Sequence, residues 1–259
     1  MSRPAPHRST RRNAGSQRRR RRTGPSPGVT LLSRRPLRGR VKTRLAEHFG
    51  APLALALHEA FLLDTLAWLR ALRRQGWRVG VEWSEPFRPR GVLRQALRGL
   101  ACGVQARGGL GRRIEMALRG TLRRGCSCAV AIGSDSPHLG AMPLRRALRS
   151  LERCDAVLGP ARDGGYYLIG LRQLRRRWFE GIDWGTSKVL GQSLTRLRAD
   201  GLRVALLDPA ADLDTPESLR ELQGAMVRSA ALRRRLRFTG RILHQLSRQT
   251  RSGQCRAQR

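Results

Sequence analysis

The chain has 259 residues, 40% of them hydrophobic, and a formal net charge of +35. Its length fits one α/β domain of roughly 200 residues with tails better than two full domains. Residues 1–28 and 225–259 contain no acid, and together they hold more than half of the excess positive charge. The charge therefore belongs mainly to the tails, and by itself it does not indicate a nucleic-acid-binding protein.

Among the 53 basic residues, only Lys42 and Lys188 are lysine, and the others are arginine. We interpret this as a compositional bias that replaces lysine by arginine wherever only charge matters. An ammonium is a compact point charge, whereas a guanidinium is a wide planar fork. Both lysines are therefore candidates for positions that need an ammonium.

The five cysteines show no C-x-x-C pair and no histidine partner at zinc spacing, so no structural metal is predicted. Cys126 and Cys128 are expected to be small core residues of a strand. No apolar run approaches the roughly 20 residues of a membrane span, and the Arg-rich start lacks the apolar region of a signal peptide. We expect a soluble, cytoplasmic protein.

The predicted elements alternate between strands and helices along residues 29–224. Residues 1–28 offer almost nothing to bury and are expected to be disordered. In chain order we predict strand 29–33, basic loop 34–40, helix 51–74, strand 77–83, helix 91–100, strand 103–105, helix 110–122, strand 126–132, helix 142–152, strands 155–158 and 166–171, helix 187–199, strand 204–207 and helix 216–223.

This alternation predicts a three-layer α/β/α domain with a mostly parallel, Rossmann-like central sheet. In such sheets ligands bind at the carboxyl ends of the strands. Residues 225–259 carry several leucines among many arginines. They are either a solvated basic tail, which we favour, or a basic amphipathic helix.

The loop after the first strand concentrates cations, a glycine and a helix N-terminus. Its candidate phosphate-binding residues are Arg34, Gly39, Lys42, Thr43 and Arg44. Unpaired N–H groups at a helix N-terminus favour phosphate, and the basic side chains would add charge-assisted hydrogen bonds. An Arg-rich surface loop without a ligand is the alternative, and the retained lysine favours the binding site.

Asp135 directly follows the apolar strand 126–132, in the sequence Gly-Ser-Asp-Ser-Pro. An acid at this place is costly unless it is paired or holds a metal. Mg²⁺ and Mn²⁺ take one or two carboxylates together with phosphate oxygens of the substrate. Asp135 is therefore a candidate metal ligand, and an N-cap of the following helix is the alternative.

Two further segments carry candidate side chains. Asp163, Gly164 and Gly165 lie between two strands, where the glycines would let the backbone approach a nucleotide and Asp163 would bind a hydroxyl, hold a metal or act as a base. A simple hairpin turn is the alternative. Later, Thr215 is expected to cap a helix. Asp212 and Asp214 are not needed for that cap, and one of them, Asp214 in our interpretation, could complete the metal site.

Together, these segments resemble the glycosyltransferase-like family associated with arsenosugar biosynthesis, within the GT-A, or nucleotide-diphospho-sugar transferase, superfamily. The resemblance implies a GT-A fold, a nucleotide near the first loop and a divalent metal near Asp135. Arg34, Arg112 and Ser218 depart from the family pattern, because the family usually has a lysine at the first position and acids at the other two. The strongest pieces are 36–45, 110–113, 133–137, 155–170 and 212–217.

The leading interpretation is metal-dependent transfer of a glycosyl group from a nucleotide sugar to a small-molecule acceptor. Mg²⁺ or Mn²⁺ at Asp135 and Asp214 would neutralise the departing diphosphate, and Lys42 and Arg44 would bind its oxygens. Asp163 would orient or deprotonate the acceptor. The alternatives are nucleotidyl transfer from a nucleoside triphosphate with release of pyrophosphate, and non-specific nucleic-acid binding through the basic tails.

Overall fold

The computed structural model describes residues 25–257, with side chains up to residue 247. Most of the predicted N-terminal tail lies outside this range. Its last residues belong to the domain, however, because Ser26 and Pro27 accept main-chain hydrogen bonds from Ser127 and Arg78, and Gly28 begins the first strand. The boundary predicted at residue 29 is therefore a few residues late.

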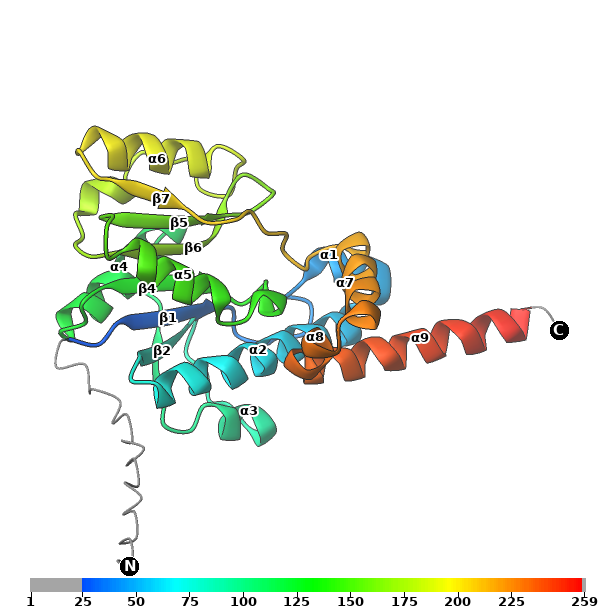
Figure 1. Ribbon diagram of the computed structural model, residues 1–259. Helices are drawn as coiled ribbons and strands as arrows, with labels where there is room; N and C mark the ends of the chain where they lie inside the picture. Colours follow the sequence, from blue (N-terminus) through cyan, green and yellow to red (C-terminus); the bar gives the residue numbers. More distant parts are fainter. Residues whose placement is uncertain (1–24, 258–259) are drawn as a thin grey trace, which may run out of the picture.

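A single sheet forms the middle layer of the domain (Figure 1). Its strands are β1 (Gly28–Ser33), β2 (Arg78–Trp83), β3 (Ala101–Val104), β4 (Ala129–Gly133), β5 (Ala156–Pro160), β6 (Tyr166–Leu171) and β7 (Val204–Leu206). The strand order is β3-β2-β1-β4-β6-β5-β7. β6 is antiparallel to both of its neighbours, and every other pair is parallel. The apolar runs of β1 and β4 suit strands that are covered on both faces.

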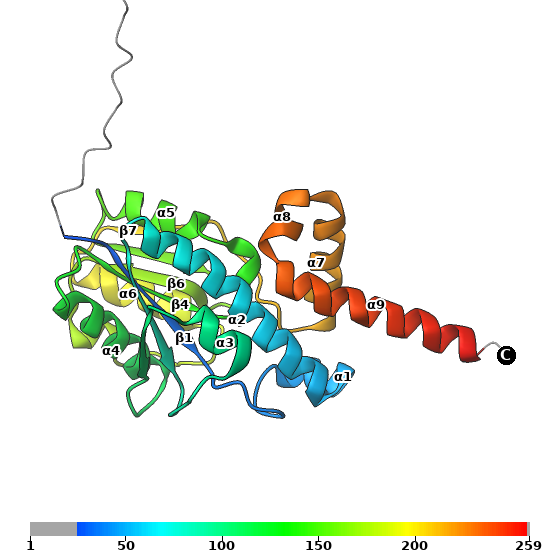
Figure 2. The ribbon, with the colours of Figure 1, turned by 90° about the horizontal axis from the view of Figure 1, so that it is seen from below.

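Helices cover both faces of the sheet (Figure 2). They are α1 (Thr43–Phe49), α2 (Ala51–Arg74), α3 (Gly91–Ala96), α4 (Leu110–Arg123), α5 (Met142–Ser150), α6 (Val189–Ala199), α7 (Pro216–Arg228), α8 (Ala230–Arg235) and α9 (Arg237–Ala257). Residues of α2 and α5 share one apolar cluster with β1 and β2, and residues of α4 and α6 share another with β4, β5 and β6. The predicted three-layer α/β/α arrangement is confirmed.

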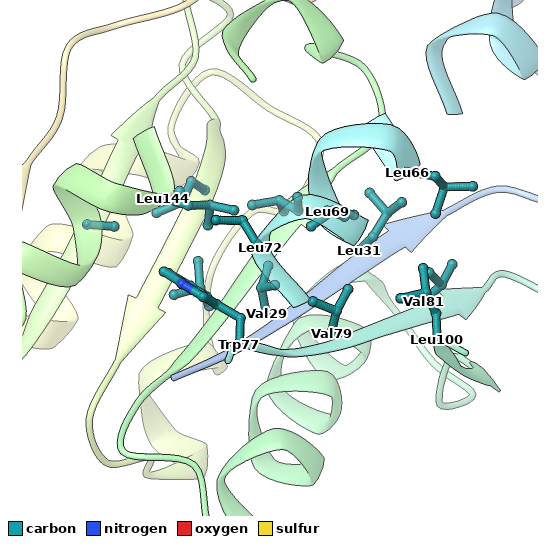
Figure 3. Packing of buried hydrophobic residues seen from close by; sticks show 14 of the residues in the cluster. Val29, Leu31, Leu66, Leu69, Leu72, Trp77, Val79, Val81, Leu100 and Leu144 are labelled. Atoms are coloured by element: carbon teal, nitrogen blue, oxygen red, sulfur yellow. The ribbon is translucent and has the colours of Figure 1, made fainter. Parts of the chain in front are cut away.

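The core on the α2 face shows why the periodicity of the sequence predicts these elements (Figure 3). Leu66, Leu69 and Leu72 repeat at helical spacing and are buried against Val29 and Leu31, which alternate along β1. Side chains on one stripe of a helix and on one face of a strand thus meet in a single layer of close contact.

The predicted core position of the cysteine pair is confirmed. Cys126 and Cys128 are both buried, although β4 itself begins only at Ala129. The cysteines at positions 102, 126, 128 and 154 are free thiols.

The last helices pack on the end of the domain, so the helical alternative for residues 225–259 is correct where side chains are described. Leu236 and Leu243 are buried in a third cluster with residues of α1, α2 and α7. Asp64, buried in the middle of α2, accepts hydrogen bonds from the main-chain N of Phe238 (3.0 Å) and from the main-chain N and Oγ1 of Thr239 (2.9 and 2.7 Å). Asp64 thereby caps the N-terminus of α9, a long-range contact that local sequence patterns do not reveal.

Contrary to the sequence-based expectation, α2 is long and apolar enough to cross a membrane by length and composition alone. Its most apolar window is 56% buried within the domain, and it carries the buried polar residues His58 and Asp64. These features are those of a core helix packed on a sheet. The cytoplasmic location remains a prediction.

Candidate active site

A cavity of about 740 Å³ lies at the carboxyl ends of β1 and β4. The loop that leads to α1, the first turn of α4, the turn between β5 and β6 and the segment 212–214 complete its lining. In a parallel sheet the carboxyl ends of neighbouring strands meet at one edge, which explains why segments distant in sequence converge here.

Lys42 lies in the wall of this cavity between two carboxylates. Its Nζ is 2.5 Å from Oδ1 of Asp135 and 2.5 Å from Oδ1 of Asp214. The lysine side chain is 3% exposed, whereas both aspartate side chains are 43% exposed. Three residues predicted from three different segments therefore form one cluster, with the ammonium inside and the carboxylates facing the cavity.

Main-chain contacts explain how these segments are joined. The N–H of Leu213 donates to the carbonyl oxygen of Asp135 at 3.0 Å, and the Leu213 side chain is buried in the same cluster as Leu45 of α1. Asp214 is thus held beside Asp135 by the backbone on one side and by apolar packing on the other.

The backbone of Lys42 is in the left-handed region, with φ 48° and ψ 50°. Within the described residues it is the one non-glycine residue with a positive φ. This conformation costs a non-glycine residue roughly 1–2 kcal/mol and tends to occur at functional sites. It turns the chain into α1 and places Nζ 5.1 Å from the ring centroid of Phe61, within range of a cation–π interaction.

The charges of the cluster stabilise one another. Burial alone would lower the pKa of Lys42, but the adjacent Asp135 and Asp214 outweigh it and raise that pKa. Burial likewise opposes ionisation of Asp135, yet Lys42 holds the pKa of Asp135 below its ordinary value. The lysine is therefore an ammonium and Asp135 a carboxylate at neutral pH.

Asp212 is a third carboxyl group at the cavity, and it behaves differently. Burial, reinforced by the charges of Asp135 and Asp214, raises the pKa of Asp212 to about 6. Its Oδ1 accepts a hydrogen bond from Ser136 at 2.5 Å. The sequence identified Asp212 only as an alternative to Asp214 as a metal ligand. A carboxyl with a pKa near neutrality in a cleft has the properties of a general acid or base.

His58 lines the same cavity and was not identified from the sequence. It lies on the buried face of α2, and its Nε2 is 3.2 Å from the carbonyl oxygen of Arg34. Burial lowers the pKa of His58, so the ring is neutral and its Nε2–H donates to that carbonyl. Its position on an otherwise apolar stripe of the helix is the sequence signal that could have identified His58 as a candidate site residue.

The segment around Asp163 is a turn between two antiparallel strands, as the hairpin alternative proposed. Asp163 lines the cavity, and its Oδ1 accepts from the N–H of Gly165 at 2.9 Å. Gly164 has φ 89°, and a Cβ there would lie 2.2 Å from the carbonyl oxygen of Ser187. Gly164 and Gly165 are not among the lining residues, so the structure gives Gly164 a packing role against residue 187.

The remaining residues predicted in the first loop divide into two groups. Arg34, Thr43 and Arg44 line the cavity and are exposed. Gly39 lies in a turn with φ 77° and is not part of the lining. Lys188, the second retained lysine, is exposed beside α6 and also lies outside this cavity.

Two departures from the family pattern have structural roles. Ser218 completes a capping box at α7: its main-chain N donates to Thr215 Oγ1 at 3.2 Å, and its Oγ accepts from the main-chain N of Thr215 at 3.1 Å. Arg112 donates to the buried Glu115 at 2.5 Å, and Arg119 bonds the other oxygen of that carboxylate. Arg112 and Ser218 therefore both have hydrogen-bond partners three residues away in the chain.

The chemistry of the carboxylates fits a divalent ion in part. Among the described side chains, no group of three or more His, Cys, Asp and Glu residues is arranged to hold a metal ion. Asp135 and Asp214 nevertheless both direct an oxygen to the point where the Lys42 ammonium lies. Two hard oxygen ligands suit Mg²⁺ or Mn²⁺ when substrate phosphates and water supply the others.

Comparison with known proteins agrees with this fold. Residues 65–186 match the model of a family described as "Uncharacterized protein conserved in bacteria (DUF2064)", a range that includes Asp135 and Asp163 but neither Lys42 nor Asp214. No curated protein matches the chain.

Several solved structures are similar. A protein of Desulfovibrio desulfuricans G20, provisionally described as a nucleotide-diphospho-sugar transferase, is 28% identical, with a TM-score of 0.68 over 85% of this chain and 98% of that chain. A 4-diphosphocytidyl-2C-methyl-D-erythritol synthase of Anaerococcus prevotii is 11% identical, with a TM-score of 0.48 over 79% and 99%. A cytidylyltransferase of Leptospira borgpetersenii is 12% identical, with a TM-score of 0.48 over 87% and 95%.

The likeness to the Desulfovibrio protein extends over most of both chains. It places this chain among GT-A-like enzymes of the nucleotide-diphospho-sugar transferase superfamily, and it confirms the prediction of a transferase. The association with arsenosugars remains a prediction.

Proposed function

We propose that the chain transfers a glycosyl group from a nucleotide-sugar donor in a metal-dependent reaction. The observation that carries this proposal is the cluster of Lys42, Asp135 and Asp214 at the strand ends. It combines a buried cation with two exposed carboxylates in a cavity large enough for a nucleotide sugar. The resemblance to the Desulfovibrio protein supports the same class of donor.

In this proposal the cationic side chains bind the diphosphate. Lys42 supplies a fixed ammonium whose orientation is set by its backbone and by the two aspartates. Arg44, in the first turn of α1 and exposed to the cavity, adds a guanidinium that can bond two phosphate oxygens at once. Both groups stabilise the negative charge that develops as the nucleoside diphosphate departs.

Asp135 and Asp214 are the residues that would hold Mg²⁺ or Mn²⁺. When bound, the ion would supply further positive charge to the diphosphate leaving group. Because the Lys42 ammonium contacts the same two carboxylates, the lysine also limits the repulsion between them before the donor arrives.

The acceptor is a small molecule with a hydroxyl or similar nucleophile. Asp212 is placed to take its proton, because a pKa of about 6 makes it ionised yet basic at neutral pH. Asp163 would orient the acceptor, since one of its oxygens is already engaged in the turn.

Incubation of the purified protein with a panel of nucleotide sugars and Mn²⁺ tests the proposal. Release of a nucleoside diphosphate is expected, with loss of at least about 100-fold in turnover in Asp135→Asn. Asp208→Asn is the control, because this aspartate is paired with Arg146 on the surface and is exposed. Release of pyrophosphate from a nucleoside triphosphate would instead identify nucleotidyl transfer, and no turnover of any donor would refute the proposal.

A further inference from the structure

One end of the cavity is lined by neutral polar side chains. Ser33 ends β1, Ser84 follows β2, and Gln105 follows β3. The parallel register pairs Trp83 with Val104, so Ser84 and Gln105 are the next residues on two adjacent strands. The Gln105 N–H donates to the carbonyl oxygen of Trp83 at 2.9 Å, which extends this register to Gln105.

The amide group of Gln105 has a fixed orientation. Its Nε2 donates to the carbonyl oxygen of Ser33 at 3.1 Å and to that of Glu82 at 2.9 Å. A primary amide has two N–H donors, so both are used by the main chain. Rotating the amide by 180° would place Oε1 against two carbonyl oxygens, which is strongly unfavourable. Gln105 therefore presents a hydrogen-bond acceptor and cannot exchange it for a donor.

The acceptor oxygen is available to a ligand. Within the described part of the chain Oε1 has no hydrogen-bond partner, and it is not among the buried polar atoms that lack one. Leu110, 49% exposed at the start of α4, lines the same cavity and offers an apolar surface. An oriented acceptor with an apolar surface is a site for a flat heterocycle.

On the proposed function, the phosphates of the donor lie at Lys42, and the nucleobase needs a separate site. Ser33 connects the two ends of the cavity: its carbonyl binds Gln105, and its Oγ is 3.3 Å from Oγ of Ser134, the residue before Asp135. A nucleotide with its diphosphate at the lysine therefore extends its base across the carboxyl ends of β1 and β2 toward Gln105.

We propose that Gln105 selects a nucleobase with a ring N–H at the centre of its Watson–Crick edge, namely uracil, thymine or guanine. Cytosine and adenine carry an acceptor nitrogen at that central position, which would face the fixed oxygen of Gln105. Ser84 supports this choice, because its Oγ already accepts from the main-chain N of Arg35 at 3.1 Å and keeps its own proton to donate. The Ser84 hydroxyl can therefore donate a hydrogen bond to the base carbonyl that adjoins the ring N–H.

The inference rests on the proposed nucleotide donor, and one titration series separates the two. Binding of UDP, TDP, GDP, CDP and ADP is measured by calorimetry with Mn²⁺ for the wild type, Gln105→Met and Ser84→Ala. At least one of UDP, TDP and GDP is expected to bind about tenfold or more tighter than CDP and ADP, and Gln105→Met is expected to reduce this ratio to about threefold or less. Affinity for inorganic pyrophosphate is expected to be unchanged in both variants.

Equal affinity of the wild type for all five nucleotides would overturn the base selection and leave the proposed function standing. An unchanged ratio in folded Gln105→Met would also overturn it. If Gln105→Met does not fold, Ser84→Ala decides: a weakened preference supports the inference and an unchanged preference overturns it. Binding of no nucleotide by the folded wild type would refute the proposed function and the inference together.

Discussion

Replacement of Lys42 tests whether the cavity requires an ammonium. Breaking a fully buried ion pair by removal of one partner costs about 3–5 kcal/mol. Here the lysine is buried, but both aspartate side chains are 43% exposed, so the carboxylates left without a partner are only partly desolvated. We therefore expect Lys42→Met to lower the free energy of unfolding by about 2 kcal/mol, or the Tm by about 4–8 °C for a domain of this size.

The pH dependence of this loss follows from the direction of the pKa shifts. The raised pKa of Lys42 means that its contribution is complete below the unfolded value of 10.5 and is lost as the pH rises through the folded pKa. The lowered pKa of Asp135 means that its contribution is present above the unfolded value of 3.8 and is lost as the pH falls through the folded pKa. The difference between wild type and variant should therefore be largest between these two limits and should fall at both extremes of pH.

Lys42→Arg is the sharper variant, because it keeps the charge and changes only its shape. A guanidinium is larger than the space of a 3% exposed lysine, so overpacking of about 1–3 kcal/mol is expected. Turnover should fall about 100-fold or more in both variants. Lys188→Met is the control, since Lys188 is exposed outside the cavity. Wild-type turnover within about threefold in Lys42→Arg would refute the argument from lysine scarcity.

Three further substitutions have defined outcomes. Because the raised pKa of Asp212 makes the protein less stable as the pH rises from 3.8 through about 6, Asp212→Asn should increase stability at pH 8 by up to about 3 kcal/mol and change little at pH 3.5. Thermal unfolding against pH measures this, and parallel curves would contradict it. Gly164→Ala should lower the free energy of unfolding by about 2–4 kcal/mol, because residue 164 has a φ of 89° and lies against the Ser187 backbone. Gly165→Ala should lower it by less than about 1 kcal/mol, because the new Cβ would approach only Asp163 Oδ1, at 3.2 Å. Equal chemical-denaturation midpoints for these two would contradict the packing role. Asp64→Ala should release the N-terminus of α9, with a loss of about 2–4 kcal/mol and faster hydrogen exchange in α9 than in the sheet. Unchanged protection of α9 would show that apolar packing alone holds it.

Local patterns were sufficient to predict the layers of the fold. The apolar stripe of α2 repeats at 3.6 residues and Gly76 follows it, and the predicted bounds 51–74 of this helix are correct. The strand before Asp135 was predicted from its continuous apolar run, and the place of Asp135 among the ligand-binding carboxyl ends of the strands follows from the parallel topology.

The parts that could not be predicted depend on contacts between distant residues. The sequence proposed Asp135 and Asp214 as metal ligands and Lys42 as a phosphate ligand, but not that the lysine lies between the two acids. The amide of Gln105 has a fixed orientation only because it donates hydrogen bonds to the carbonyl oxygens of Ser33 and Glu82, which lie on adjacent strands. Neither hydrophobic periodicity nor a local motif predicts contacts between residues so far apart in the sequence.

The central claim is that Asp135 and Asp214 hold a divalent ion, and that this ion and Lys42 bind the diphosphate of a nucleotide. Calorimetric titration of nucleoside diphosphates into the wild type and Asp135→Asn, each with and without Mn²⁺, tests it most directly. We predict that Mn²⁺ tightens binding at least about tenfold in the wild type and much less in the variant. The same affinity with and without Mn²⁺ in both proteins would contradict the account.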